Sequence, residues 1–416
     1  MSQRAVIIGG GIVGCSAALA LARNGWSVLV VERRAGVGLG STARSSAVVR
    51  CHYSRPEGVR LAVEGRSVWQ NWADFVGLEH PRATYHDVGV LFLLKRHLKQ
   101  GTGPETLGMK AEMDARAIDA RVQMMEFAGV DVSFLNMRRL QKQFPTMVFN
   151  DPNVVGLWEP DSGYVSNPTG AVEDLREAAE EQGVAFLFET ELVGGHSEWV
   201  KEKRVLREVL IRRADGATAA FPVDAVVNCA GPYSQSVNVA LDCPLPLSTT
   251  PQRQLVVEAI WTNPVPLPAL ADLDLGFYIR PDRDCFKVGA VLPRDHVSFH
   301  HSPEIEVSSE ERASFEARFI RQLKVRLPEV TLEDVQVTSG VYDWTVSDSY
   351  PLLGATELGR YYVAVGTSGA WFKSGPVIGQ LLAERIVRDV SGDTRTLVTL
   401  PKCGLKIDLA RFSPYR

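Results

Sequence analysis

The segment RAVIIGGGIVGCSAALALARNGWSVLVVE, residues 4–32, carries the strongest structural signal in the chain. It begins with a run rich in β-branched residues and passes through Gly9-x-Gly11-x-x-Gly14 into CSAALALA, which is rich in helix formers. A second apolar run follows and ends in Glu32. Strand, glycine turn, helix, strand and acid within about thirty residues predict the βαβ unit that binds dinucleotides.

Each residue type in this unit has a physical role. Gly9 permits a tight turn, Gly11 lets a pyrophosphate approach the backbone, and Gly14 lets the helix pack closely on the strand. The N-terminus of the helix offers unpaired N–H groups and a positive dipole to the phosphates. Glu32 is placed to accept hydrogen bonds from the adenosine ribose.

The same segment has an alternative interpretation. Residues 5–22 carry no charge over eighteen positions, which meets the length of a membrane-span candidate and could also pass as the apolar core of a signal peptide. Four glycines, at positions 9, 10, 11 and 14, argue against both. The sequence therefore predicts no transmembrane span.

The composition excludes several classes of protein. The 416 residues are 45% hydrophobic and 23% charged, as in globular and not disordered chains. A net charge of −4 provides no basic field for nucleic acid or an anionic membrane. The six cysteines are widely spaced without a CxxC, which favours free thiols and a cytoplasmic location. None of the eight histidines has metal-ligand spacing, so we expect no metal site.

The rest of the nucleotide-binding material lies in separated segments. After Glu32 the chain continues as a glycine- and serine-rich loop over residues 33–60, where a nicotinamide fold would continue with strands and helices. A strand and helix pattern returns at 171–188, DAVVNCAGPYS at 224–234 resembles a strand entering a turn, and RYYVAVGTSGAWFKSGP at 360–376 precedes a helix. This discontinuity argues against a one-domain nicotinamide fold.

These motifs resemble the FAD-dependent D-amino acid oxidase superfamily, and within it the glycine oxidase and sarcosine oxidase branch, including the β-subunit type of sarcosine oxidase. The resemblance is most specific at GGGIVGCSAALALARNGWSVLVVER, GLGSTARSSAVVRCHY, EPDSGYVSNP, VVNCAGPYS and DSYPLLG…VAVGTSGAWFKSGP. It is weakest over residues 96–129, a charged stretch that we interpret as a family-specific insertion.

The resemblance implies an α/β fold with two domains. A discontinuous Rossmann-like FAD-binding domain would comprise residues 1–85, 159–240 and 344–416. An α+β substrate domain with a mainly antiparallel sheet would comprise residues 86–158 and 241–343. Short β-branched runs alternate with helix-like segments in the latter regions, which agrees with this arrangement.

Three cations lie in apolar surroundings: Arg50 in SSAVVRCHY, Lys287 in CFKVGAVL and Lys373 in GTSGAWFKSGP. Each could simply be a solvated side chain. The resemblance implies that Arg50 binds a substrate carboxylate, for which the guanidinium fork is suited. It places Lys287 beside the flavin to assist oxygen reduction, because a fixed cation stabilises developing negative charge. Lys373 would hold the flavin or the carboxylate, and Tyr278 would line the substrate pocket or belong to the core.

Ser374 and Gly375 suit a helix N-cap, and Pro376 suits the first turn. A helix beginning there would direct its positive end at whatever precedes it, and the resemblance implies that this is the flavin. Together the glycine motif and the resemblance imply a cofactor-binding set of Gly9, Gly11, Gly14, Glu32, Arg33, Ser41, Thr42, Ala230, Gly231, Gly366, Gly369, Phe372 and Lys373.

The attachment of the flavin can also be predicted. Some sarcosine oxidases tether flavin through a cysteine in a stretch that corresponds to GVYDWTVSD here, where Tyr342 stands at the comparable point. A tethering histidine, as in other relatives, is not identified in GLGSTARSS. We therefore predict non-covalent FAD.

The resemblance implies oxidation of a small carboxylate-bearing amine, such as sarcosine, glycine or a D-amino acid. Hydride would pass from Cα to flavin N5, the imine would hydrolyse, and oxygen or another acceptor would reoxidise the flavin. Three alternatives stay open: a dehydrogenase of a 2-hydroxy acid or glycerol 3-phosphate, a subunit that passes electrons to a partner or quinone, and a non-catalytic nucleotide-binding protein.

Overall fold

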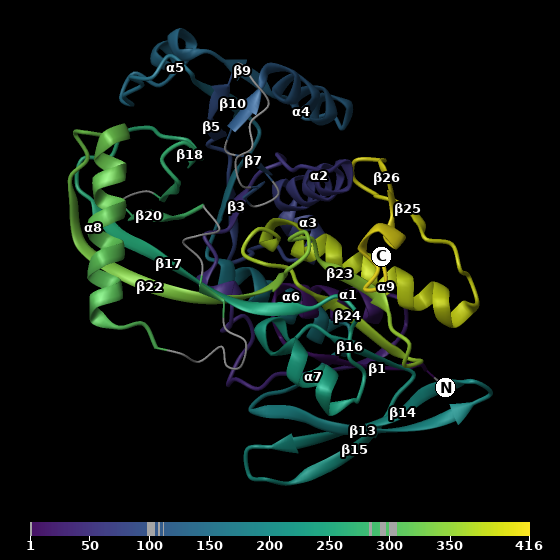
Figure 1. Cartoon of the computed structure of the whole chain (residues 1–416). Helices are drawn as coiled ribbons and strands as arrows, with labels where there is room; N and C mark the ends of the chain where they lie inside the picture. Colours follow the sequence, from purple (N-terminus) through teal and green to yellow (C-terminus); the bar gives the residue numbers. More distant parts are fainter. Residues whose placement is uncertain are drawn as a thin grey trace.

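Two sheets organise the computed structural model of the chain, which describes residues 2–97, 105–106, 109–110, 112–282, 285–291, 297–298 and 306–416. A six-stranded sheet lies in one half of the molecule and a ten-stranded sheet in the other (Figure 1). The N-terminus and the C-terminus both lie in the half that contains the six-stranded sheet (Figure 1).

The six-stranded sheet has the order β12-β2-β1-β16-β24-β23, and only β23 runs antiparallel to its neighbour. Its strands are β1 (Arg4–Ile8), β2 (Ser27–Val31), β12 (Ala185–Leu187), β16 (Ala225–Asn228), β23 (Leu352–Ala355) and β24 (Tyr361–Val365). The central parallel strands β1, β16 and β24 are almost entirely buried apolar runs, as expected for a sheet covered on both faces, whereas the edge strand β12 is partly exposed. They come from three separated parts of the chain.

Helix α1 (Ile12–Arg23) packs between α6 (Pro168–Glu181) and α9 (Gly375–Ser391). It begins directly after Gly11, and the left-handed Gly25 follows its end. Residues of α1 and α9 approach so closely that a Cβ on Gly379 would lie 2.6 Å from the Ala17 nitrogen. Ser374 stands at the N-cap of α9 as predicted, but its hydroxyl donates to the Leu61 carbonyl and does not cap the helix.

The ten-stranded sheet is mainly antiparallel, with parallel pairs only at β18–β5 and β5–β8 among the described strands. Its strands are β5 (Val90–His97), β8 (Glu112–Asp114), β9 (Ser133–Leu135), β10 (Val154–Glu159), β17 (Thr249–Trp261), β18 (Ala269–Asp272), β19 (Phe277–Asp282), β20 (Cys285–Ala290), β21 (Val297–Ser298) and β22 (Leu332–Thr345). Together the two sheets confirm the predicted fold class. The domain boundaries themselves stay a prediction.

Helix α8 (Ser309–Arg326) covers one face of the ten-stranded sheet. Phe319 and Leu323 of the helix pack against Phe277 and Phe286 of the sheet. The opposite face is turned toward the other half of the molecule, because Tyr278 on β19 contacts Ser46 there. The long strands β17 and β22 run from α8 toward the six-stranded sheet (Figure 1).

Smaller elements complete the fold. A meander of β13 (Thr190–Val200), β14 (Lys203–Arg213) and β15 (Thr218–Pro222) lies beside α7 (Ser234–Ala240). The remaining described elements are β3 (Val48–Val49), β4 (Thr84–His86), β6 (Glu105–Thr106), β7 (Met109–Lys110), β11 (Gly163–Ser166), β25 (Leu397–Thr399), β26 (Lys406–Asp408), α2 (Pro56–Gln70), α3 (Trp72–Val76), α4 (Ala115–Phe127) and α5 (Met137–Gln143), with short 3-10 turns at Thr42–Arg44, Gly231–Tyr233, Phe372–Ser374 and Leu409–Phe412.

The predicted insertion, residues 96–129, lies partly outside the described residues. Its described end forms α4, which packs against α2. None of the helices that the structure describes has both the length and the apolar character needed to cross a membrane.

Candidate functional site

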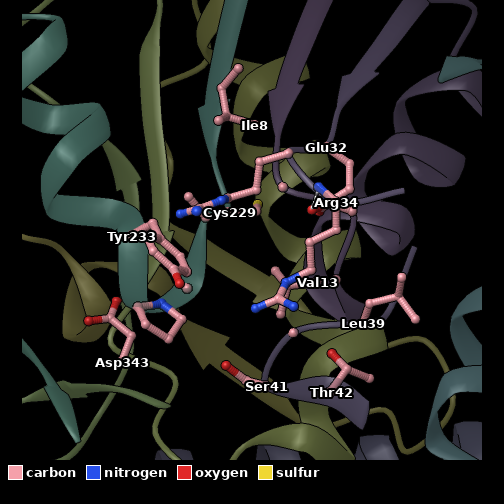
Figure 2. Close-up of a pocket in the computed structure, with 18 of the residues that line it drawn as sticks. Ile8, Val13, Glu32, Arg34, Leu39, Ser41, Thr42, Cys229, Tyr233 and Asp343 are labelled. Atoms are coloured by element: carbon pink, nitrogen blue, oxygen red, sulfur yellow. Dashed lines mark hydrogen bonds between the residues drawn. The ribbon is translucent and has the colours of Figure 1, made fainter. Parts of the chain in front are cut away.

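A pocket of about 430 Å³ opens at the carboxyl ends of β1, β2 and β16 (Figure 2). In an open parallel sheet this edge is where nucleotides bind. Residues from β22 close the far side of the pocket. The predicted residues that line it are Gly9, Gly11, Glu32, Arg33, Ser41, Thr42, Ala230 and Gly231.

The glycine turn forms a bare backbone cradle at this pocket. A Cβ on Gly9, which has φ +108°, would lie 2.4 Å from the Cys229 carbonyl oxygen. A Cβ on Gly14 would lie 2.0 Å from the Gly9 oxygen, so Gly14 allows α1 to pack on the turn and does not line the pocket. A Cβ on Gly11 would meet, among the described atoms, the Thr42 hydroxyl alone, at 3.5 Å. The backbone therefore leaves room for a pyrophosphate at the N-terminus of α1.

Glu32 lies at the end of β2 with its carboxylate held by the backbone (Figure 2). One oxygen accepts a hydrogen bond from the Gly10 N–H at 2.7 Å, and the other accepts from the Arg34 N–H at 2.8 Å. Each oxygen keeps acceptor capacity for a ribose hydroxyl. The Arg33 guanidinium lies 3.9 Å from the centre of the Tyr233 ring, a cation–π contact at the pocket wall.

The other four predicted cofactor residues are not among the described residues lining this pocket; Thr367 and Ser368 line it from the same loop. Gly366 has φ +70° and donates its N–H to Asp343. A Cβ on Gly369 would lie 2.8 Å from the Gln254 amide oxygen. Phe372 is a core residue whose ring stacks on Trp69 at 5.3 Å. Lys373 lies deeper, beside Arg50.

Asp343 on β22 is a pocket residue that the sequence reasoning missed (Figure 2). Its carboxylate accepts hydrogen bonds from the Ser234 hydroxyl at 2.8 Å and from the Gly366 N–H at 2.7 Å. It thereby joins three segments around the pocket. Burial raises the pKa of Asp343 to about 6, although both hydrogen bonds oppose the rise. An acid inside the aromatic run VYDW was the available sequence signal.

Arg50 and Lys373, far apart in the chain, meet at Tyr53. Arg50 is 6% exposed, and its guanidinium carbon lies 4.4 Å from the centre of the Tyr53 ring. Lys373 is 3% exposed and donates from Nζ to the Tyr53 hydroxyl at 3.0 Å and to the Ala370 carbonyl. Arg50 Nη1 donates to the His52 carbonyl, whereas Nη2 is buried and has no hydrogen-bond partner among the described atoms.

This pair of cations has an electrostatic consequence. No carboxylate in the described part of the chain forms an ion pair with Arg50 or Lys373. Burial, and then the charge of Arg50, hold the pKa of Lys373 well below its usual value. The buried carboxylate of Glu159 lies near enough to act on both cations through space, but among the described residues it forms an ion pair with neither. The buried positive charge is therefore compensated only in part, and this site is suited to bind an anion.

Lys287 and Tyr278 lie on the sheet face opposite α8. Lys287 is partly exposed, and its Nζ lies 3.1 Å from the Glu258 carboxylate. The sequence left open whether Lys287 is desolvated or points outward to water. In the structure it forms an ion pair from β20 to Glu258 on the neighbouring strand β17. The Tyr278 hydroxyl lies 2.5 Å from the Ser46 hydroxyl, which ties the ten-stranded sheet to the loop that precedes Arg50.

All six cysteines are free thiols in the structure. Within the described ranges, no group of three or more His, Cys, Asp or Glu side chains is placed to hold a metal ion.

Comparison with known proteins identifies the family. The sequence model of the FAD dependent oxidoreductase family matches residues 4–385. The chain belongs to this family. The predicted superfamily and its cofactor, FAD, are thereby confirmed. A search of curated protein sequences found no match.

Solved structures share the fold of this FAD-dependent oxidoreductase. L-proline dehydrogenase from P. horikoshii is 21% identical with a TM-score of 0.77, and the match covers 100% of this chain and 97% of that one. Glycine oxidase from Geobacillus kaustophilus is 19% identical with a TM-score of 0.73 and coverage of 93% and 95%. Iminodiacetate oxidase from Chelativorans sp. BNC1 is 17% identical with a TM-score of 0.69 and coverage of 99% of both chains.

The raised pKa of Asp343 predicts a pH-dependent contribution to stability. Between about pH 4 and pH 6 the folded protein holds a proton that the unfolded chain releases, so the free energy of unfolding falls as pH rises through this range. Between pH 4 and pH 7 the free energy of unfolding of the wild type should fall by about 3 kcal/mol relative to that of Asp343→Asn. Thermal unfolding of both FAD-loaded proteins across this range measures the difference.

The matched control is Asp334→Asn, an exposed acid on the same strand. This variant should follow the wild type at every pH. A stability difference between wild type and Asp343→Asn that does not change with pH would contradict the assignment.

Proposed function

We propose that this FAD-dependent oxidoreductase oxidises a small amine that carries a carboxylate next to the carbon being oxidised. The observation that carries the proposal is the pair of buried cations, Arg50 and Lys373, which have no carboxylate partner in the described part of the chain. The Nη2 atom of Arg50, which has no hydrogen-bond partner within the described ranges, offers a charge-assisted hydrogen bond to a carboxylate oxygen. A monoanionic headgroup fits this site better than a neutral one.

The side chains would act by positioning. FAD, when bound, would accept a hydride, which is two electrons and one proton, from the substrate carbon. Arg50 and Lys373 would fix the carboxylate, which leaves one orientation for the adjacent C–H bond. An amine bound in its neutral form needs no protein base, because the nitrogen lone pair forms the imine as the hydride leaves. Water then hydrolyses the imine to a carbonyl compound and an amine or ammonia.

The charge state of Lys373 would follow the occupancy of the site. Desolvation disfavours the ammonium form while the site lacks an anion. A carboxylate beside Nζ would stabilise this form, so we expect substrate binding to raise the pKa of Lys373. Tyr53 would hold Nζ in place through its hydroxyl, which itself donates to the Ala370 carbonyl at 2.6 Å.

A specific observation favours oxidation of a 2-hydroxy acid as the second candidate. His52 follows Arg50 closely, is fully buried, and has two ring nitrogens without hydrogen-bond partners among the described atoms. Burial holds its pKa well below the usual value, so the ring is a neutral imidazole. Alcohol oxidation uses such a base to remove the hydroxyl proton. The ring packs edge-on against Phe92, however, at 4.7 Å.

Anaerobic bleaching of the flavin tests the proposal directly. The panel comprises sarcosine, glycine, both enantiomers of proline, D-alanine, lactate and glycerol 3-phosphate. We expect at least one amine to bleach the flavin absorbance, and its methyl ester, which lacks the carboxylate charge, to fail. Bleaching by lactate or glycerol 3-phosphate alone would support the second candidate, and no bleaching by any amine would overturn the first.

Admission of air to the bleached protein then tests the electron acceptor. We propose oxygen, with Lys287 assisting its reduction, although the Glu258 carboxylate offsets part of the lysine charge. Return of the flavin absorbance slower than turnover with an artificial acceptor would instead favour a subunit that passes electrons to a partner or quinone.

Substitution of Arg50 should weaken substrate binding selectively. Arg50→Met keeps an unbranched side chain and removes the charge, so KM for the amine should rise by roughly 10- to 100-fold, the value of one or two charged hydrogen bonds. Steady-state kinetics measures the change. The matched control is Arg55→Met, a half-exposed arginine five positions later that pairs with Asp348; it should leave KM within about threefold of the wild type. Equal effects of the two variants would contradict the role of Arg50.

We also propose that the FAD is held without a covalent bond, since Tyr342 replaces the tethering cysteine. Its hydroxyl donates to the Arg44 carbonyl at 2.7 Å. Acid precipitation should therefore leave the flavin in the supernatant, measured by its absorbance. A yellow protein pellet would contradict non-covalent attachment.

A further inference from the structure

Glu159 is a buried carboxylate that directly follows the apolar run of β10. Its side chain is fully enclosed, and one oxygen accepts hydrogen bonds from the Cys51 N–H at 2.7 Å and the Ser162 hydroxyl at 2.6 Å. The other oxygen has no hydrogen-bond partner among the described atoms. Burial raises the pKa of Glu159, while the cations Arg50 and Arg66 lower it. Burial of a carboxylate costs free energy, so Glu159 is expected to have a structural or functional role that offsets this cost.

The Cys51 amide belongs to the short segment that carries the anion site. Arg50 precedes it, and Tyr53, which contacts Lys373, follows two residues later. The segment 50–53 lies between β3 and α2 and has no ladder partner of its own. Because the amide is buried, an acceptor from elsewhere in the fold must satisfy it. Glu159 supplies that acceptor.

The position of Glu159 is determined by the register of the ten-stranded sheet. Glu159 pairs with Val90 where β10 runs antiparallel to β5. Phe92, two residues further along β5, packs against the His52 ring at 4.7 Å and lies 5.6 Å from the Arg50 guanidinium. Strands β10 and β5 therefore hold the segment 50–53 from the side of the ten-stranded sheet.

Contacts within the segment 50–53 make the placement of the Arg50 guanidinium depend on the position of this segment. The guanidinium folds back onto the chain, with Nη1 donating to the His52 carbonyl and the Tyr53 ring beneath it. A shift of the Cys51 amide would displace this carbonyl and ring, and with them the partnerless Nη2. Reacting groups held to within an ångström lose rate or affinity steeply when they are displaced.

We propose that Glu159 is a positioning residue for the carboxylate site: by accepting the Cys51 N–H, it sets where Arg50 presents its free Nη2 to the substrate. The inference rests on the proposed function, since Arg50 must bind the carboxylate. It attributes the role of Glu159 to the reach of its acceptor oxygen and not to its negative charge. A nearby negative charge by itself would weaken the binding of an anion.

Two variants separate the reach of the side chain from its charge. Glu159→Asp keeps the carboxylate but shortens the side chain by one methylene, about 1.5 Å, so it no longer reaches the Cys51 amide. Glu159→Gln keeps the reach and an acceptor oxygen but loses the charge. We expect Glu159→Asp to weaken carboxylate binding by about tenfold or more, and Glu159→Gln to remain within about threefold of the wild type. Ser162→Ala, which removes only the second hydrogen bond, is the matched control and should also remain within this range.

The measurement is titration of each FAD-loaded protein with acetate, followed by the change in flavin absorbance, with acetamide as the neutral counterpart. Steady-state KM and kcat for the amine provide a second readout: Glu159→Asp should raise KM and leave kcat within about threefold, because positioning acts on binding. FAD content and circular dichroism establish that each variant is folded.

The outcomes distinguish the two proposals. If the wild type binds acetate no better than acetamide, the proposed carboxylate site fails and the inference fails with it. If the wild type binds acetate and Glu159→Asp binds it equally well, or Glu159→Gln is weakened as much as Glu159→Asp, the carboxylate site stands and the positioning role is overturned.

Discussion

The burial of two cations beside each other is the electrostatic constraint on which the rest of this site depends. Arg50 and Lys373 repel, and neither has a carboxylate partner in the described part of the chain. The fold tolerates them by surrounding them with oriented oxygens, such as the hydroxyl of Tyr53 and the carbonyls of His52 and Ala370. Carbonyl dipoles compensate the charge only in part, so an anionic ligand is stabilised when it enters.

The cofactor pocket and the site of Arg50 and Lys373 are connected by strand β22 and by the loop from Gly366 to Lys373. The glycine turn after β1 and the acid after β2 form the nucleotide end of the pocket. Strand β22 of the ten-stranded sheet then contributes Asp343, which binds the Gly366 loop, and that loop continues to Lys373. The two halves of the molecule therefore share the wall of one pocket.

Local patterns in the sequence predicted the elements whose causes are local. The turn at Gly9 and the close packing at Gly14 are consequences of missing side chains, so they follow from residue identity alone. The partners of isolated residues did not follow from such local patterns. Phe372 lies in a flavin-edge motif yet stacks on Trp69, and Lys287 is paired with Glu258. In both cases the partner lies on a distant element, which no spacing in the sequence reveals.

The sequence by itself determined the βαβ nucleotide unit, because short-range backbone geometry and residue type suffice for it, and only the tertiary structure brought Arg50 and Lys373 together at Tyr53. Only the tertiary structure decided which buried acids accompany them. Asp343 and Glu159 each accept one hydrogen bond from a residue more than a hundred positions away, Ser234 and Cys51 respectively. The physical reason is that a hydrogen bond across the fold depends on how whole strands pair, and local sequence does not encode that pairing.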